Sequence, residues 1–203
     1  MTSRFEDALF AELLEVDGAT RSRLHARLAA EAEAAGVLDI AYRTIDSPLG
    51  LLLLAATDHG LVRVAYAIQD HERVLDELAT KISSRVLHAP ARLDLAAHEI
   101  DDYLSGRRTT FDLPLDFRLS SGFRRTVLDH LPDIGYGTTA SYATVALAAG
   151  NPKAVRAVGS ACAKNPLPIV VPCHRVVRSD GTIGQYAGGS EAKRTLLDLE
   201  ATP

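Results

Sequence analysis

The chain is organised around twelve residues near its C-terminal end, Pro166-Leu167-Pro168-Ile169-Val170-Val171-Pro172-Cys173-His174-Arg175-Val176-Val177. Pro172 fixes its own φ and disfavours the helical region for the residue before it. The apolar run therefore predicts a buried strand that stops at Pro172 and presents Cys173 at a rigid turn. The ionisable neighbours His174 and Arg175 favour the thiolate, the reactive form of cysteine. The stretch predicts a nucleophile, and a buried apolar cysteine is the alternative.

A histidine next to a cysteine in sequence need not touch it, because adjacent side chains often point apart. His174 could act through a water molecule, with a carboxylate from elsewhere in the chain orienting its ring. The local sequence does not identify the residue that supplies this carboxylate.

The first part of the chain predicts a three-stranded antiparallel meander. Residues 39–46 alternate like a strand, apolar segments follow, and Ser47-Pro48-Leu49-Gly50 and Asp58-His59-Gly60 supply the turns between them. The expected strands are residues 39–46, 51–56 and 61–67. Helices are expected over 70–82 and 92–105, followed by an extended connector over 111–117.

The last part of the chain predicts helices with a short glycine-containing turn between two of them. The expected helices are residues 121–131, 139–149 and 153–163, with a tight turn at 135–137 and a second turn at 150–152. Helix, short turn and helix is the helix-turn-helix pattern. The exposed residues expected on the second of these helices are small, namely Ala154, Ala157, Ser160 and Ala161. Such a helix offers few groups for base readout in the major groove but fits a narrow groove closely.

An N-terminal pair of helices is expected over 4–16 and 19–35, with Thr20 as the N-cap of the second and Gly36 ending it. We interpret this pair as a cap packed on the first domain, with a docking element for a partner as the alternative. The predicted domains are residues 1–36, 37–116 and 117–203.

The charge is unevenly distributed along the chain. Residues 1–120 carry 13 basic and 20 acidic side chains, whereas residues 121–203 carry 9 basic and 6 acidic. Because phosphate contacts need only a local basic face, the overall charge of −4 does not exclude DNA. Two cysteines do not make a disulfide framework, and neither a membrane span nor a secretory signal is expected, so we expect a cytoplasmic protein.

The motifs around Cys173 resemble those of the alkylguanine-DNA alkyltransferases, also called methylated-DNA–protein-cysteine methyltransferases. They are Ser141-Tyr142, Gly150-Asn151-Pro152-Lys153-Ala154-Val155-Arg156-Ala157-Val158-Gly159, Asn165-Pro166, Pro172-Cys173-His174-Arg175-Val176, Gly184-Gln185-Tyr186-Ala187-Gly188-Gly189 and Glu200. The resemblance covers residues 121–200 and continues more weakly to about residue 39. It implies an α+β protein with a ribonuclease-H-like N-terminal domain and a mostly helical C-terminal domain that contains the helix-turn-helix.

The resemblance implies a role for each residue of the catalytic group. Cys173 is the alkyl acceptor, and His174 takes the thiol proton through a bound water. Glu200 orients the imidazole and stabilises its charged form, which is the logic of a catalytic triad used once. Asn165 ties the turn before the active-site strand together through side-chain to backbone hydrogen bonds. Arg175 is interpreted as structural.

The resemblance also implies how double-stranded DNA is held. The helix over 153–163 is expected in the minor groove with little sequence preference, contacting DNA through Ala157, Gly159 and Ser160. Arg156 is the finger that replaces the flipped base, and Tyr142 rotates the target nucleotide's 3′ phosphate. A phosphate-binding arginine and a core tyrosine are the alternatives for these two residues.

The expected walls of the base pocket are Pro168, Val176, Gln185, Tyr186 and Ala187. By the resemblance, Tyr186 donates a hydrogen bond to the base or its O6 atom, an oxyanion-type contribution. Gly188-Gly189 lets the loop approach the base closely. We interpret Cys162 as packing. Val155 and Ala187 depart from the commonest family pattern, which bears on the fit to the groove and on base binding.

The predicted function is therefore single-turnover repair of O6-alkylguanine, and of O4-alkylthymine, by irreversible alkyl transfer to Cys173. No cofactor is expected, and the zinc site of some family members is not expected because no cysteine precedes Cys162. We expect a monomer in solution. The alternatives are a lesion sensor without transfer, a cysteine hydrolase, and a helix-turn-helix regulator.

Overall fold

The computed structural model describes residues 17–201, and the chain divides into two units, residues 1–38 and 39–203. The helix expected over 4–16 lies outside the described residues. In the first unit, α2 (Gly18–Ala34) begins after Asp17, whose carboxylate accepts a hydrogen bond of 2.8 Å from the backbone N–H of Thr20. The prediction of Thr20 as the N-cap was wrong, because aspartate is a strong cap and already stands three residues earlier.

The helix α2 ends as expected, since Gly36 has a left-handed φ of 65° directly after the C-cap residue. None of its side chains is buried. Its role as a cap or as a docking element remains a prediction.

A four-stranded sheet opens the second unit. The strands β1 (Ile40–Ile45), β2 (Leu52–Thr57) and β3 (Gly60–Tyr66) form the expected antiparallel meander. A fourth strand, β4 (Val86–His88), pairs parallel with β1, so the order is β3-β2-β1-β4. The prediction of three strands missed β4, because a strand of three residues is too short to show an alternating pattern.

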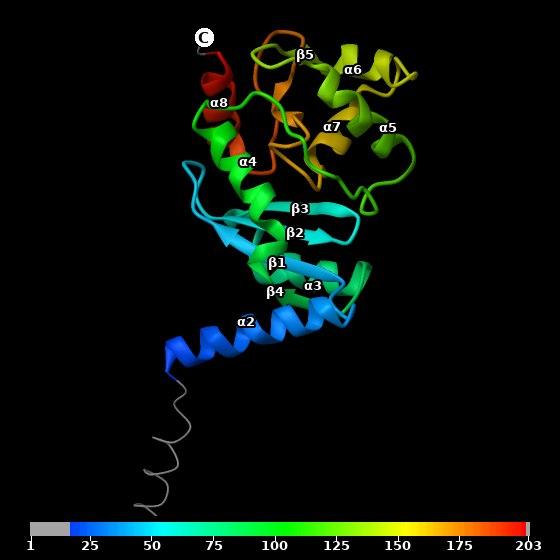
Figure 1. Ribbon diagram of the computed structural model, residues 1–203. Helices are drawn as coiled ribbons and strands as arrows, with labels where there is room; N and C mark the ends of the chain where they lie inside the picture. Colours follow the sequence, from blue (N-terminus) through cyan, green and yellow to red (C-terminus); the bar gives the residue numbers. More distant parts are fainter. Residues whose placement is uncertain (1–16, 202–203) are drawn as a thin grey trace, which may run out of the picture. The chain divides into compact units, whose positions relative to one another are not determined.

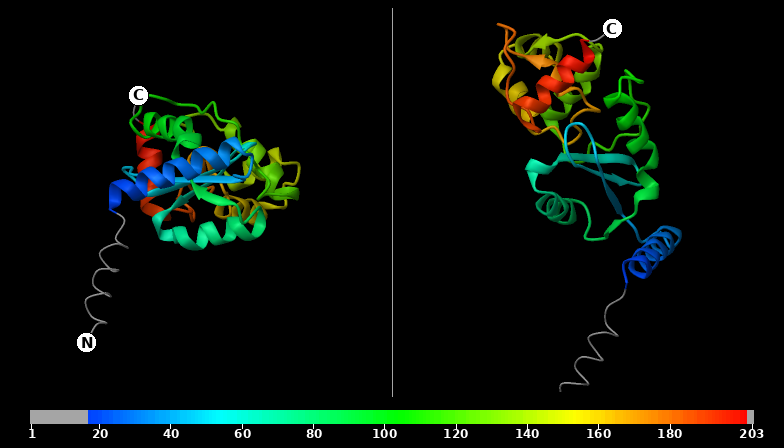
Figure 2. Two further views of the ribbon diagram at one scale, coloured as in Figure 1. Left: turned by 60° about the horizontal axis from the view of Figure 1, so that its bottom comes forward. Right: turned by 90° about the vertical axis from the view of Figure 1, so that its left-hand side faces the viewer.

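Helices lie on both sides of this sheet (Figure 2). The helix α3 (His71–Lys81) places Val74 and Leu78 in one buried cluster with side chains of β1, β2 and β3. The opposite side carries the 3₁₀ helix η2 (Pro90–Leu93) and α4 (Asp94–Leu104). Every residue of β2 is buried, as a strand covered on both faces requires.

The rest of the unit consists of short elements that position one loop (Figure 1). They are α5 (Gly122–His130), the 3₁₀ helix η3 (Leu131–Asp133), β5 (Ala140–Ser141), α6 (Tyr142–Ala148), α7 (Val155–Ala163), the 3₁₀ helix η4 (Cys173–Arg175), β6 (Val176–Val177) and α8 (Gly189–Glu200). The helix expected to begin at Thr139 begins instead at Tyr142, because Ser141 caps it by accepting a hydrogen bond from the N–H of Thr144. Ala140 and Ser141 pair in parallel with β6.

The buried strand expected before Pro172 was a wrong prediction. Residues 166–171 are buried but form turns, and Ile169 has a φ of 75°, which a β-branched residue rarely adopts. This residue reverses the chain direction, so that Cys173 begins the one-turn helix η4 rather than following a strand. Cys173 lies at a turn, as expected, but this turn is the helix η4 and not the end of a strand.

The edge strand β3 connects the sheet to this loop. Its Val64 N–H donates a hydrogen bond of 2.8 Å to the carbonyl of Pro166, and its Leu61 pairs with the connector at Pro114 and Asp116. Of the four strands of this sheet, β3 is the one nearest to α7 and α8 in Figure 1. Residues that far precede Cys173 in sequence therefore contact the segment that carries it.

Candidate active site

Cys173 is buried, with 1% of its surface exposed, and its sulfur has a single polar neighbour among the described hydrogen bonds. The Asn165 amide nitrogen donates to Cys173 Sγ over 3.2 Å and to the Val171 carbonyl over 2.8 Å. The Asn165 carbonyl oxygen accepts from the N–H of Leu167. One side chain therefore holds both ends of the turn and also contacts the sulfur.

The surroundings of Cys173 favour the thiol over the thiolate at neutral pH. Burial raises its pKa to about 11, although the Asn165 hydrogen bond and the charge of Lys193 act in the opposite direction. The expectation that His174 and Arg175 favour the thiolate is not met, because both side chains are directed to Glu200. At neutral pH the sulfur needs a base to become nucleophilic.

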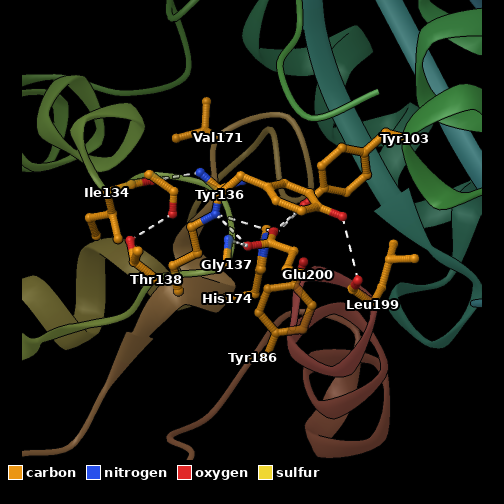
Figure 3. A network of polar contacts seen from close by, with 12 residues as sticks. Tyr103, Ile134, Tyr136, Gly137, Thr138, Val171, His174, Tyr186, Leu199 and Glu200 are labelled. Carbon is orange, nitrogen blue, oxygen red and sulfur yellow. Dashed lines mark hydrogen bonds and ion pairs between the residues drawn. The ribbon is translucent and has the colours of Figure 1, made fainter. Parts of the chain in front are cut away.

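His174 is fully buried, and its Nε2 lies 2.6 Å from Glu200 Oε1 (Figure 3). Burial lowers its pKa, so the resting imidazole is neutral. A neutral ring that donates from Nε2 to the carboxylate carries a lone pair on Nδ1. His174 Nδ1 is buried without a hydrogen-bond partner among the described residues. This atom is free to accept a proton.

Glu200 is the centre of a buried polar network, although it lies near the end of the chain. Its carboxylate accepts hydrogen bonds from Tyr103 Oη, from Arg175 Nε at 2.9 Å and from the Gly137 N–H at 3.1 Å, besides its contact with His174. Only 4% of Glu200 is exposed. Arg175 also donates to the Ile134 carbonyl over 2.6 Å, which supports its structural interpretation.

The network makes a prediction about acid stability. Burial alone would raise the pKa of Glu200, but the hydrogen bonds from His174, Arg175 and Tyr103 lower it to about 2 from the ordinary 4.5. Between these two pH values the unfolded chain binds more protons than the folded chain, so the free energy of unfolding falls as the pH falls. We expect Glu200→Gln to lose about 1–3 kcal/mol at neutral pH and to flatten that acid dependence.

Thermal unfolding of both proteins from about pH 6 to about pH 3 measures this dependence. The wild-type Tm is expected to fall more steeply than the Tm of Glu200→Gln. Parallel curves for the two proteins would show that Glu200 does not carry the acid dependence.

A second tyrosine pair joins the loop before α8 to the sheet. Tyr186 Oη and Tyr66 Oη lie 2.9 Å apart, and both side chains are buried. Burial raises the pKa of both hydroxyls, so both keep their protons at neutral pH. The Tyr66 ring also occupies the space beside Gly188, where an added Cβ would meet ring atoms at 2.6–2.8 Å. Glycine at 188 is therefore required by Tyr66.

We expect Tyr66→Phe to lower the free energy of unfolding by about 1–3 kcal/mol, because it leaves the buried Tyr186 hydroxyl without its partner. Tyr42→Phe is the matched control, since the Tyr42 hydroxyl makes no hydrogen bond within residues 17–201. Urea unfolding of the two variants compares them directly. Equal stability of the two variants would contradict the prediction.

An open groove of about 590 Å³ runs along the same loop. Its lining includes Gln185 and Tyr186, two of the residues expected to form the base pocket. The Tyr186 ring centre lies 6.3 Å from that of His174, so this tyrosine connects the groove to the buried site. Pro168 and Val176 are buried and do not line the groove, and Ala187 is half-buried beside it. Cys173 is also absent from the lining.

Four of the five predicted DNA-contacting residues lie on α7, and the fifth, Tyr142, begins α6. Arg156, Ala157 and Ser160 are exposed and Gly159 is half-buried, but Ala161 is buried, which corrects its expected exposure. Tyr142 at the start of α6 is half-buried, and its hydroxyl lies so close to Gly184 that no side chain fits there. Cys162 is buried on the inner side of α7, as its packing role predicts.

The sequence interpretation missed three side chains that the structure adds to the site. Tyr103 and Tyr66 come from α4 and β3, and no local pattern links either to Cys173. Lys193 is fully buried on α8 and donates a hydrogen bond of 2.6 Å to the Val176 carbonyl. A lysine inside an apolar helix face was the available signal for the third.

Residues 17–201 contain neither a metal-binding cluster nor a membrane-spanning helix. No group of three or more His, Cys, Asp or Glu side chains there is arranged to hold a metal ion. No helix in that part of the chain has the length and apolar character that a bilayer crossing requires.

Comparison with known proteins gives a consistent result. Residues 40–117 match the family described as 6-O-methylguanine DNA methyltransferase, ribonuclease-like domain, and residues 122–202 match its DNA binding domain. The methylated-DNA–protein-cysteine methyltransferase of Mycolicibacterium paratuberculosis is 41% identical over 161 residues, which are 79% of this chain and 92% of that protein. The constitutive enzyme of Bacillus subtilis is 38% identical over 78% of this chain and 94% of its own length.

Solved structures agree with the sequence matches. The crystal structure of Mycobacterium tuberculosis OGT in complex with DNA superposes with a TM-score of 0.69 at 37% identity, covering 80% of this chain and 93% of that one. A ribonuclease-like domain followed by a DNA-binding domain is the arrangement of the 6-O-methylguanine DNA methyltransferases. The chain belongs to the methylated-DNA–protein-cysteine methyltransferase family.

Proposed function

We propose that this protein repairs DNA directly, by moving the alkyl group from O6 of guanine to its own Cys173. The observation that carries the proposal is the placement of Cys173, which contacts Asn165 and precedes a His174–Glu200 pair with a free, buried Nδ1 atom. This is the arrangement of nucleophile, base and orienting carboxylate that activates a weak nucleophile. Family membership supports the same assignment.

The transfer balances without a cofactor. The thiol proton passes through a water molecule to His174 Nδ1, and Sγ attacks the alkyl carbon. An S–C bond forms as the C–O6 bond breaks, and the bonding electron pair leaves with the base. The proton lost by the thiol replaces the alkyl group on the guanine. The thioether is stable, so each molecule reacts once.

Two neighbours, Glu200 and Tyr186, assist the step directly. Glu200 keeps the imidazole oriented and stabilises its protonated form, and its own contacts with Tyr103 and Arg175 hold the carboxylate in place. Tyr186 donates a hydrogen bond toward the leaving O6 atom, where negative charge develops. Because Cys173 is only 1% exposed, the loop that contains Tyr186 has to move for the base to enter.

The proposal for DNA binding concerns α6 and α7, with Arg156 and Tyr142. The helices α6 and α7 act as the helix-turn-helix, and the small exposed face of α7 enters the minor groove with little sequence preference. Arg156 fills the space of the flipped base, and Tyr142 rotates the 3′ phosphate. The sheet with its helices is the ribonuclease-H-like domain, and the protein acts as a monomer in the cytoplasm.

Incubation of the protein with duplexes that contain O6-methylguanine or O4-methylthymine tests the proposal. We expect one methyl group per protein molecule and no further turnover. A hydrolase would continue to turn over and remain unmodified, a lesion sensor would bind without transfer, and a regulator would prefer one operator sequence over lesion-containing DNA.

A further inference from the structure

A second cavity, of about 390 Å³, shares Ala163 with the lining of the Tyr186 groove and is otherwise lined by different residues. It is bounded by β3, α3, α5 and the residues that follow α7, and its volume is within the range of ligand sites, roughly 300–1,000 Å³. The polar and charged residues of its lining are Arg63, Gln69, Glu77, Lys81, Arg124, Lys164 and Asn165. Four of these side chains are cations and one is an acid, in a chain whose net charge is −4.

Most of these cations make no hydrogen bond or ion pair in the described part of the chain. Lys81 Nζ lies 3.5 Å from Glu77 Oε2. By contrast, the side chains of Arg63, Arg124 and Lys164 make no hydrogen bond or ion pair within residues 17–201. Three unpaired cations around one hollow repel one another, and an anion in the hollow removes that repulsion.

Arg63 is the most informative of the three. It lies in the central part of β3, and the residue is half-buried. Burial lowers the pKa of Arg63, although the charge of Glu77 acts in the opposite direction. A guanidinium taken from water without a partner costs free energy, and its fixed donor geometry suits carboxylate or phosphate oxygens.

We propose that this cavity binds phosphate oxygens, and that their source is the backbone of the DNA that lies along α7. The second half of this inference rests on the proposed function. Ala163 lines both this cavity and the Tyr186 groove, and Lys164 directly follows α7. A strand that follows α7 therefore brings its closely spaced phosphates past Lys164 and Arg124 toward Arg63. The sheet thus contributes cations to the DNA-binding surface.

The salt dependence of duplex binding tests the proposal. We expect the double variant Arg63→Gln/Arg124→Gln to reduce the slope of log K against log [salt] by about 1.8, because each phosphate contact contributes about 0.9. Arg23→Gln is the control for net charge, since Arg23 is exposed on α2 without a hydrogen bond or ion pair to residues 17–201. Glu77→Gln should strengthen binding, which keeps the test valid if the double variant folds poorly.

Inorganic phosphate and pyrophosphate, titrated into the full chain and followed by chemical shifts, distinguish the two sources of phosphate. Binding that the double variant loses, with an unchanged DNA slope, would assign the cavity to a free phosphate ligand. An unchanged slope together with no phosphate binding would overturn the proposal. Methyl transfer from free O6-methylguanine to the wild-type protein tests the proposed function separately, because the free base carries no phosphate.

Discussion

Cys173→Ala is expected to abolish alkyl transfer to the protein while leaving its affinity for duplex DNA essentially unchanged. The sulfur is the only atom of the protein that receives the alkyl group in the proposed reaction, and Cys173 is buried whereas Arg156, Ala157 and Ser160 on α7 are exposed. The Asn165 amide loses one acceptor but keeps the Val171 carbonyl, so the turn persists. The small cavity left by the sulfur costs about 1 kcal/mol of stability.

The second cysteine supplies the control for this variant. Cys162 is also buried, and burial raises its pKa further above the ordinary value than that of Cys173. Within residues 17–201 the Asn165 amide donates to Val171 and to Cys173 but not to Cys162, so Cys162 lacks the environment of the proposed acceptor. We expect Cys162→Ala to accept one methyl group from a methylated duplex. Transfer that persists in Cys173→Ala, with the label on Cys162, would contradict the assignment.

Arg156→Ala is expected to slow transfer from duplex DNA by roughly 30- to 150-fold, because base flipping costs a few kcal/mol and Arg156 offsets part of that cost. Transfer from the free base O6-methylguanine should fall much less, since no base has to leave a stack. Single-turnover rates with the two substrates measure the difference.

Arg156→Lys separates the finger from a phosphate contact. Lysine keeps the charge but lacks the planar group that stacks in a duplex, so a finger is not replaced by lysine. A phosphate contact would be largely restored. Full recovery in Arg156→Lys, or equal losses on duplex and free base in Arg156→Ala, would contradict the finger role.

Local patterns were sufficient for most of the fold. Alternation in β1, the continuous apolar run of the fully buried β2 and the glycine-containing turns between the strands predicted the meander, because these are the two patterns typical of strands. The same local logic failed at β4, whose three residues pair with β1 only through the α3 crossover. It also failed at residues 166–171, where the apolar content was read as a strand although Ile169 turns the chain.

In the candidate site, residues close to Cys173 in sequence were predicted, whereas residues brought to it by tertiary packing were missed. Cys173, His174 and Asn165 lie within nine residues, and their proximity follows from the sequence. Tyr103 and Tyr66 reach Glu200 and Tyr186 across 97 and 120 residues, and only the packing of α4 and β3 against the later loops reveals these contacts. The reactivity of Cys173 was also misjudged, because neighbouring charges in sequence were directed to Glu200 and not to the sulfur.

The most direct test is peptide mapping by mass spectrometry after the wild-type protein has reacted with a duplex that contains one O6-methylguanine. The proposed function predicts restored guanine in the DNA and one methyl group on the peptide that contains Cys173, at a ratio of one to one. An intact lesion with unmodified Cys173, after incubation of a folded protein that binds the duplex, would contradict it.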